Sequence, residues 1–146
     1  MDERPRTKAF FTSRFEHALD DKGRVTLPVR YRKHFPDSTA YLVPAAHGEP
    51  CVRVYNMQSW DEYDAKYIEA LNEFEADQVS SLIRDLYGSM DEVTVDKGGR
   101  IMLPSGVVDE LRLSGRVLLV GHRDHFEIWD PETFYAYQSA QDEEGV

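Results

Sequence analysis

Two short stretches of the sequence carry the same chemically distinctive residues in the same order. Residues 20–28 read "DDKGRVTLP" and residues 96–104 read "DKGGRIMLP", so that an aspartate, a glycine, an arginine, a leucine and a proline recur at an offset of 76. A guanidinium is a planar fork of donors that suits phosphate oxygens, or O6 and N7 of guanine in a major groove. Turn geometry does not require an arginine after the glycine, so Arg24 and Arg100 are candidates for binding nucleic acid.

The other repeated residues have the properties of a tight turn between two strands. An aspartate can accept hydrogen bonds from nearby backbone N–H groups, and a glycine takes the positive φ that such a turn needs. Proline suits the first position of the short helix that is expected to follow, at about residues 29–35 in the first copy. The predicted turn-structuring residues are Asp20, Gly23, Pro28, Asp96, Gly99 and Pro104.

The repeat extends well beyond the two turns. Residues 51–63 match residues 125–137 at an offset of 74, and each copy reads as strand, turn, strand, short helix and two strands. Two long copies suit two half-domains that complete each other, because a solenoid needs several units to cover its ends. The predicted first half is 12–58 and the second, with a C-terminal helix, is 89–137. Residues 1–11 and 138–146 are predicted tails.

The segment between the two halves, residues 59–88, has the pattern of a helical linker. Its apolar residues recur near helical spacing, which predicts two amphipathic helices at about 60–71 and 75–86. Most of the acidic residues of this segment lie opposite the apolar stripe. Such a stripe is typical of core or of a subunit interface, but it leaves open an alternative function, an oligomeric protein-interaction scaffold that uses the aromatic helices.

The charge of the chain is unevenly distributed. The net charge is −10, which by itself disfavours an anionic partner because the field of such a protein repels phosphate. Residues 1–34, however, carry nine Lys or Arg against five Asp or Glu, while residues 35–146 carry 8 against 22. This asymmetry is compatible with a basic binding face on an acidic body.

The two motifs and their surroundings resemble a known family. The pattern D-x-x-G-R, followed by an apolar residue and two positions later by Leu and Pro, is similar to the signature of AbrB-type (SpoVT-AbrB) swapped-hairpin DNA-binding domains. Two copies, "LDDKGRVTLP" and "VTVDKGGRIMLP", followed by "VLLVGHRDHFEIWD", resemble the MraZ family of bacterial transcriptional regulators over roughly residues 12–137.

The resemblance implies both a fold and a function. The fold is α+β, in which two pseudo-symmetric β-hairpin and short-helix halves form one swapped-hairpin β-barrel with flanking amphipathic helices, and subunits form a homo-oligomeric ring. The function is regulation of transcription, most simply repression, by binding double-stranded DNA at direct repeats in the promoter of the division and cell-wall gene cluster that contains the protein's own gene. A cytoplasmic, nucleoid-associated location follows. The predicted DNA-binding residues are Arg14, Lys22, Arg24, Lys97 and Arg100.

The first alternative to DNA binding is that the protein is an enzyme, in which Asp20 and Asp96 act as a paired catalytic acid and base. Both acids stand on polar turns beside lysines and arginines, which favours ionised carboxylates over the raised pKa that such a pair needs. We therefore predict no enzymatic activity, no catalytic residues and no cofactor.

The sequence also offers one candidate metal cluster and one cysteine. "HRDH" at residues 122–125 has two histidines and Asp124, but no third histidine or cysteine is spaced to complete a ligand set, so a loop between strands is the preferred interpretation and no metal site is predicted. The single Cys51 is compatible with a reducing cytoplasm. No stretch approaches the roughly 20 apolar residues that would cross a bilayer, so no membrane partner is predicted.

Overall fold

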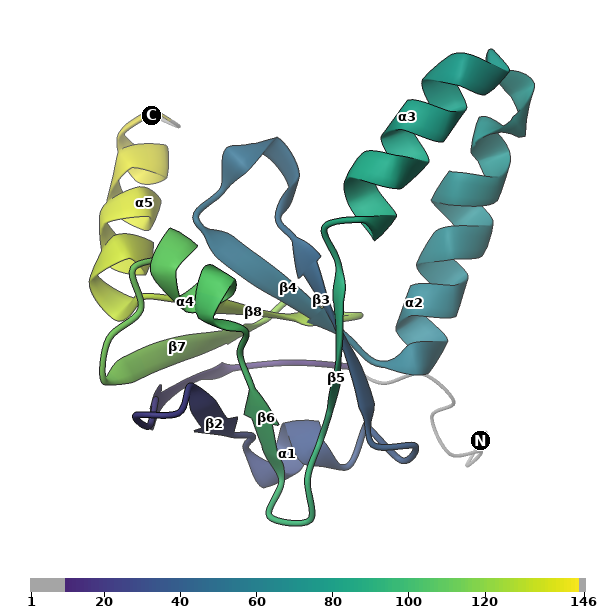
Figure 1. Ribbon diagram of the computed structural model, residues 1–146. Helices are drawn as coiled ribbons and strands as arrows, with labels where there is room; N and C mark the ends of the chain where they lie inside the picture. The colour runs from purple at the N-terminus through teal and green to yellow at the C-terminus, as the bar shows by residue number, and fades with distance from the viewer. Residues whose placement is uncertain (1–9, 145–146) are drawn as a thin grey trace, which may run out of the picture.

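The computed structural model describes residues 10–144 and has the predicted order of elements in both copies (Figure 1). The first copy contains β1 (Arg14–Ala18), β2 (Arg24–Thr26), α1 (Val29–Arg32), β3 (Thr39–Pro44), the short 3-10 turn η1 (Ala46–Gly48) and β4 (Cys51–Tyr55). The second copy contains β5 (Asp91–Thr94), β6 (Arg100–Met102), α4 (Ser105–Glu110), β7 (Arg116–Gly121) and β8 (Phe126–Trp129). The predicted repetition of strand, turn, strand, helix and two strands is therefore confirmed.

Each copy is followed by a helix that leaves its last strand. After β4 comes α2 (Met57–Tyr63), which continues as a π-helical turn, η2 (Asp64–Ile68), and a 3-10 turn, η3 (Glu69–Glu73), before α3 (Ala76–Tyr87). After β8 comes α5 (Pro131–Glu144), which extends beyond the predicted boundary at residue 137. The first helix begins earlier than expected because Asn56 caps it, its side chain accepting from the Ser59 N–H at 2.8 Å. No helix in the described part of the chain is long and apolar enough to cross a membrane.

The strands pair mainly between the two copies. The large sheet has the order β1-β7-β8-β4-β3-β5, and β2 pairs with β6 in a separate two-stranded ribbon; every pairing of these strands is antiparallel. The first strand of each copy joins the third strand of the other, as β1 with β7 and β5 with β3. Among the strands described, only the hairpins β3–β4 and β7–β8 pair within a copy. The two copies therefore need each other to complete the sheet.

The sheet does not close on itself. Its edges are β1 and β5, so the fold is a mixed α+β arrangement with an open antiparallel sheet, and the predicted swapped-hairpin barrel is not confirmed. Figure 1 shows the β2–β6 ribbon and α1 below the sheet, while the hairpin of α2 and α3 projects from its other side.

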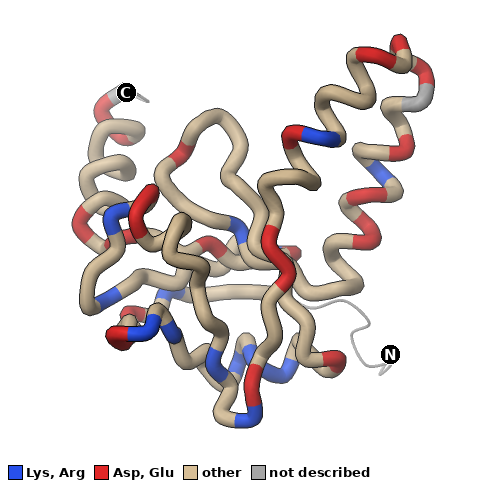
Figure 2. Tube along the Cα trace, viewed as in Figure 1, with Lys and Arg blue, Asp and Glu red and all other residues tan. Residues whose placement is uncertain are grey.

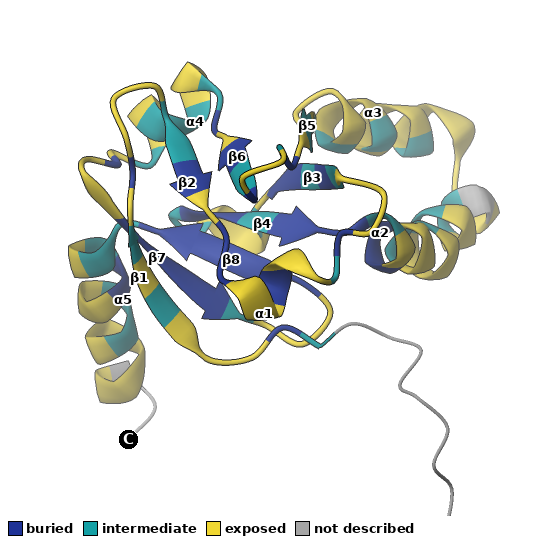
Figure 3. Cartoon of the chain, turned by 90° about the horizontal axis from the view of Figure 1, so that it is seen from below, coloured by how far each residue is buried: buried dark blue, intermediate teal, exposed yellow. Residues whose placement is uncertain are grey.

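The main core lies between the ribbon and the sheet. Val25 of β2 and Ile101 of β6 face inward and are fully buried, and Tyr31 of α1 is buried beside them. Figure 3, viewed from below, shows the largely buried strands of the sheet next to β2 and β6. Phe11, at the end of the predicted N-terminal tail, also lies in this core, with its ring 5.3 Å from that of Tyr31.

Two smaller clusters cover the opposite face of the sheet. Trp129 and Cys51 pack against Phe134 of α5 in one cluster, and Tyr55 packs against Trp60 of α2 in the other. The helices that follow the two copies thus occupy equivalent positions, which extends the internal symmetry beyond the turns.

The inward and outward positions of the ribbon give a direct test of this packing. Ile101→Ala removes a buried side chain and is expected to lower the free energy of unfolding by about 2–5 kcal/mol. Met102→Ala on the neighbouring, 54% exposed position is the matched control and is expected to change it by no more than about 0.5 kcal/mol. Urea unfolding of both variants measures the difference; equal losses would show that the ribbon does not pack as described.

Candidate nucleic-acid interface

The first repeated turn is built around one carboxylate. Asp20 Oδ1 accepts hydrogen bonds from the backbone N–H groups of Lys22 (2.9 Å) and Arg24 (2.8 Å). Its Oδ2 accepts from Arg24 Nε at 2.6 Å. Gly23 has φ +80° and donates its N–H to the Asp20 carbonyl at 3.0 Å. The aspartate therefore holds both the backbone of the turn and the base of the arginine side chain.

The second turn repeats this geometry. Asp96 Oδ1 accepts from the backbone N–H groups of Gly98 and Arg100, both at 2.9 Å, and Oδ2 accepts from Arg100 Nε at 2.9 Å. Gly99 has φ +79°, nearly the same as its counterpart in the first turn. Asp20 and Asp96 thus make equivalent hydrogen bonds to the backbone of their turns, and Gly23 and Gly99 have the same left-handed backbone conformation.

These contacts keep both aspartates ionised. The pKa of the Asp20 carboxyl is lowered chiefly by the hydrogen bond from the Arg24 backbone N–H, and the pKa of Asp96 is lowered in the same way by Arg100, although partial desolvation opposes the shift in each case. A catalytic acid at neutral pH needs a raised pKa. The direction of both shifts therefore disfavours the acid–base pair considered as a rival.

The two turns are also hydrogen-bonded to each other's strands. The Leu27 N–H donates to the Gly99 carbonyl, and the Leu103 N–H donates to the Gly23 carbonyl, both at 2.8 Å. A β-carbon on Gly23 would lie 3.0 Å from the Leu103 carbonyl oxygen. Glycine is thus required at this position both by the left-handed backbone and by the close approach of the other copy.

Pro28 and Pro104 stand directly before the helices that follow the ribbon. The Pro28 carbonyl accepts from the backbone N–H groups of Tyr31 and Arg32, both at 2.9 Å, and so begins α1. Pro104 does the same for α4. Each proline thus occupies the N-cap, one position before the one predicted.

The ribbon turns both motif arginines to the same side. In its register Arg24 pairs with Met102, Arg100 pairs with Thr26, and Val25 pairs with Ile101. Because side chains alternate along a strand, the buried middle pair places the four flanking residues on the outer face. The two arginines lie two residues apart along the ribbon, about 7 Å in that direction.

Each motif arginine retains donors for a ligand. Arg24 and Arg100 use Nε on their aspartates, and within the described residues neither makes a hydrogen bond through its terminal Nη groups. Their side chains are 30% and 40% exposed. The carboxylate therefore fixes the direction of the guanidinium while the pair of Nη atoms remains accessible.

The other predicted DNA-binding residues are not all close to the ribbon. Lys22 and Lys97 are exposed at the tips of the two turns, beside the motif arginines. Arg14 is at the opposite end of β1, six residues or about 20 Å of strand before Asp20, with its guanidinium 4.9 Å from the centre of the Phe134 ring. The structure therefore brings four of the five predicted residues together and leaves Arg14 apart.

Helix α1 adds two arginines that the motif did not predict. Arg32 donates through Nη2 to the Lys97 carbonyl at 2.6 Å and packs so closely against Gly99 that a β-carbon there would lie 2.8 Å from its Cδ. Arg30 donates to Ser13 Oγ at 2.7 Å. The only sequence signal for them was the basic balance of the first 34 residues. Figure 2 shows Lys and Arg gathered around the ribbon and α1, whereas the α2–α3 hairpin is largely acidic.

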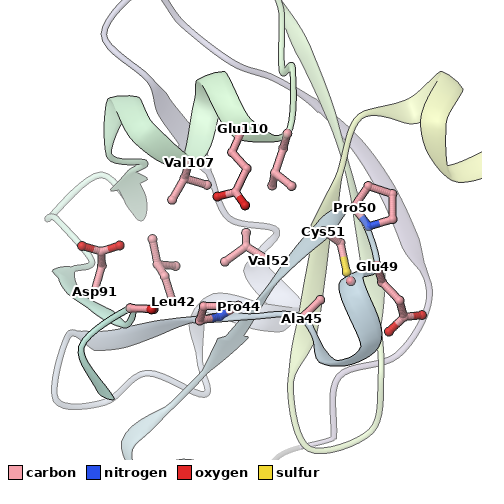
Figure 4. Close-up of a pocket in the computed structure, with 13 residues that line it drawn as sticks. Leu42, Pro44, Ala45, Glu49, Pro50, Cys51, Val52, Asp91, Val107 and Glu110 are labelled. Atoms are coloured by element: carbon pink, nitrogen blue, oxygen red, sulfur yellow. The ribbon is translucent and has the colours of Figure 1, made fainter. Parts of the chain in front are cut away.

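The structure also contains an acidic hollow away from the ribbon (Figure 4). It has a volume of about 290 Å³ and lies between α4 and the β3–β4 hairpin. Leu42, Val52 and Val107 form apolar walls, and Glu110 extends from α4 toward the strands. Its lining includes three acidic residues and neither lysine nor arginine, so it does not suit a phosphate group.

Comparison with known proteins agrees with the repeated architecture. The family model described as "MraZ protein, putative antitoxin-like" matches residues 10–81 and 86–145. The chain belongs to the MraZ family. The prediction made from the two motifs is thereby confirmed, and the matched segments include both turns and both following helices.

Individual MraZ proteins match along most of their length. "Transcriptional regulator MraZ" of Natranaerobius thermophilus is 34% identical over 128 residues, which is 88% of this chain and 86% of that protein. The protein of the same name from Pseudoalteromonas translucida is 33% identical over 129 residues (87% and 83%), and that from Spiroplasma kunkelii is 31% identical over 123 residues (84% and 83%). MraZ is a family of transcriptional regulators and not of enzymes, which confirms the prediction that this chain is not an enzyme.

Two glycine variants test the geometry of the turn. Gly23→Ala forces a β-carbon into a left-handed conformation against the Leu103 carbonyl and is expected to lower the free energy of unfolding by at least about 1–2 kcal/mol. Gly106→Ala in α4, where nothing lies within 4 Å, is expected to be neutral or to stabilise by up to about 1 kcal/mol. Chemical unfolding of the two proteins should give a clear loss only for the first; a neutral Gly23→Ala would contradict the turn.

Proposed function

We propose that this MraZ-family chain is a sequence-specific DNA-binding transcriptional regulator whose β2–β6 ribbon enters the major groove. The observation that supports this most directly is the outer face of the ribbon, where Arg24 and Arg100 point to the same side and are each held by an aspartate. A major groove about 12 Å wide admits a two-stranded ribbon. Both arginines could then reach base edges from a single rigid element.

The chemistry of the outer face suits direct reading of bases. With Nε committed to its aspartate, each guanidinium offers its two Nη groups to O6 and N7 of guanine. Thr26 and Met102 stand beside the arginines and present methyl groups to the same groove. Lys22 and Lys97 at the turn tips, with Arg32 of α1 beside the second turn, are proposed to contact phosphates on either side, which would fix the position of the ribbon without reading sequence.

An acidic protein with few cations per chain needs several copies to bind DNA firmly. The binding face of one chain neutralises only a few phosphates, so its own affinity should be weak and steeply dependent on salt. A ring-shaped homo-oligomer that engages several repeated sites makes each later contact intramolecular, and such linkage can raise apparent affinity by about 10²–10⁴. The acidic α2–α3 hairpins then disfavour sequences that lack the repeats.

The contact between copies is proposed to use helix α3. None of its residues is buried, although Val79, Leu82 and Ile83 form an apolar face, and Leu82 is 55% exposed. Phe74, 62% exposed, lines a hollow of about 510 Å³ together with Val79 and Ile83. Uncovered apolar surface of this kind marks interaction sites. A second copy of the chain is the proposed occupant, because the DNA site itself requires several copies.

The regulated target follows from the family resemblance. We propose that the ring represses the division and cell-wall gene cluster that contains its own gene by binding direct repeats in the promoter, at the nucleoid in the cytoplasm. The alternative is an oligomeric scaffold that binds another protein through the same aromatic helices. DNA binding and the α3 contact are separable surfaces, so each can be tested without the other.

Removal of a motif arginine tests the DNA site. Arg24→Ala, and separately Arg100→Ala, should weaken binding to a duplex from upstream of the protein's own gene by about fivefold to 150-fold, corresponding to about 1–3 kcal/mol for a bidentate guanine contact. The loss should be much smaller on the same duplex with its repeats scrambled. A salt-titrated gel-shift assay measures both affinities.

Two controls sharpen this assay. Arg24→Lys keeps the charge but loses the fork, so it should lose preference for the repeats while retaining nonspecific binding. Lys66→Ala removes one positive charge from η2, away from the ribbon, and should leave the preference intact. Unchanged affinity of Arg24→Ala and Arg100→Ala with an intact oligomer would refute the proposed site.

A charge placed on α3 tests the proposed subunit contact. Leu82→Glu should reduce the oligomeric mass measured by size-exclusion chromatography with light scattering, because an ionised carboxylate cannot be buried in an apolar contact without a large cost. Ser81→Glu adds the same charge to an exposed position on the other side of the same helix and should leave the mass unchanged. An unchanged mass for Leu82→Glu would show that α3 is not the subunit contact.

A further inference from the structure

The loop between β7 and β8 is held firmly although it is short and polar. Its ends are closed by the His122 N–H, which donates to the His125 carbonyl at 2.9 Å. Arg123 exchanges two backbone hydrogen bonds with Phe11, at 2.7 Å and 3.1 Å, and has a φ of +67°. The loop therefore has little freedom to move its side chains apart.

Three metal-binding side chains meet on this loop. His122, Asp124 and His125 can each offer one ligand atom, and the three atoms lie within 4.8 Å of one another. Two imidazole nitrogens and a carboxylate oxygen form a ligand set that zinc and related divalent ions accept. These three residues were already present in the sequence pattern, and the fold brings their ligand atoms close together.

His125 is an unusual residue for a surface loop because its ring is buried. It is 6% exposed, stacks on the ring of Tyr55 at 4.5 Å and on that of His122 at 4.6 Å, and has Nδ1 2.7 Å from Asp124 Oδ1. Among the described residues its Nε2 has no hydrogen-bond partner. Nε2 lies on the other edge of the ring from Asp124, so Nδ1 is the nitrogen that an ion held by Asp124 would reach.

Two of the three side chains can be reached by an ion from solvent. His122 and Asp124 are exposed, which leaves the cluster open to solvent on one side.

We propose that His122, Asp124 and His125 form a binding site for a divalent transition metal ion, with Zn²⁺ as the representative ion. Ligands about 2.1 Å from a tetrahedral ion are about 3.4 Å apart, so small rotations of the two exposed side chains complete the geometry. Three protein ligands leave a fourth position for water or for a group from another molecule. The ion ties the β7–β8 loop to the buried Tyr55–His125 stack and stabilises the fold at this point.

The site is separate from the proposed DNA-binding face. In the β1–β7 register Arg14 pairs with Val120 and Ala18 pairs with Arg116, so the loop after β7 lies at the end of β1 away from the first turn. Metal binding can therefore be measured without DNA, and its failure would leave the proposed regulatory function untouched.

Titration of tag-free protein with ZnCl₂ by isothermal calorimetry tests the site. One ion per chain is expected to bind and to raise the thermal unfolding midpoint. His122→Ala and Asp124→Asn change exposed side chains, should still fold, and should each weaken binding by more than about tenfold. Co²⁺ should give visible absorption bands in the unaltered protein, and these bands should be lost in His122→Ala.

His47→Asn is the matched control for loss of a histidine. His47 is exposed on η1 and has a φ of 60°, which asparagine tolerates, so this variant should bind Zn²⁺ as the unaltered protein does. Absence of binding at millimolar Zn²⁺ overturns the proposal. Binding that persists unchanged in both His122→Ala and Asp124→Asn overturns it equally, because the ion would then be held elsewhere.

Discussion

Two backbone hydrogen bonds, one at each turn, join the turns to the opposite copy, and the geometry of the proposed binding face depends on them. The Leu27 N–H donates to Gly99 and the Leu103 N–H to Gly23, which fixes the register of β2 against β6. A shift of one residue would exchange the two faces of the ribbon, exposing its buried middle pair and burying the arginines. The same contacts that complete the core therefore also decide where the guanidinium groups point.

The local features of the fold could be predicted because each is encoded within a few residues. The spacing of aspartate, glycine and arginine specifies a turn, and an apolar repeat specifies a helix, so both copies and their order of elements were accessible from the sequence. The pairing of β1 with β7 and of β5 with β3 was not specified in this way. This pairing depends on contacts between segments far apart along the chain, for which a single sequence has no local signal. For the same reason the sequence did not predict that the sheet would remain open at β1 and β5.

In the candidate site, too, the local features could be predicted from the sequence and the long-range contacts could not. Arg24 and Arg100 were predicted as binding residues because a tight turn does not itself require an arginine after the glycine. The sequence did not predict that the Nε of each arginine would donate a hydrogen bond to the aspartate of its turn. Arg32 reaches the second turn only because the copies interlock, and Arg14 is too far along β1 to join them. The loop at residues 122–125 is a similar case, since the separation of its three side chains depends on how β7 and β8 pair and on the burial of His125.

The two halves of the proposed binding face are similar in backbone but unequal in charge. At the offset of 76, Arg30 and Arg32 of α1 correspond to Gly106 and Val108 of α4, so only the first copy carries a basic helix. A DNA-binding protein with true twofold symmetry matches a palindrome, because both half-sites then meet the same surface. Unequal halves would give the ribbon a direction on the duplex that it is proposed to bind. Copies arranged around a ring would each meet DNA in the same direction, which is the symmetry of direct repeats and not of inverted ones.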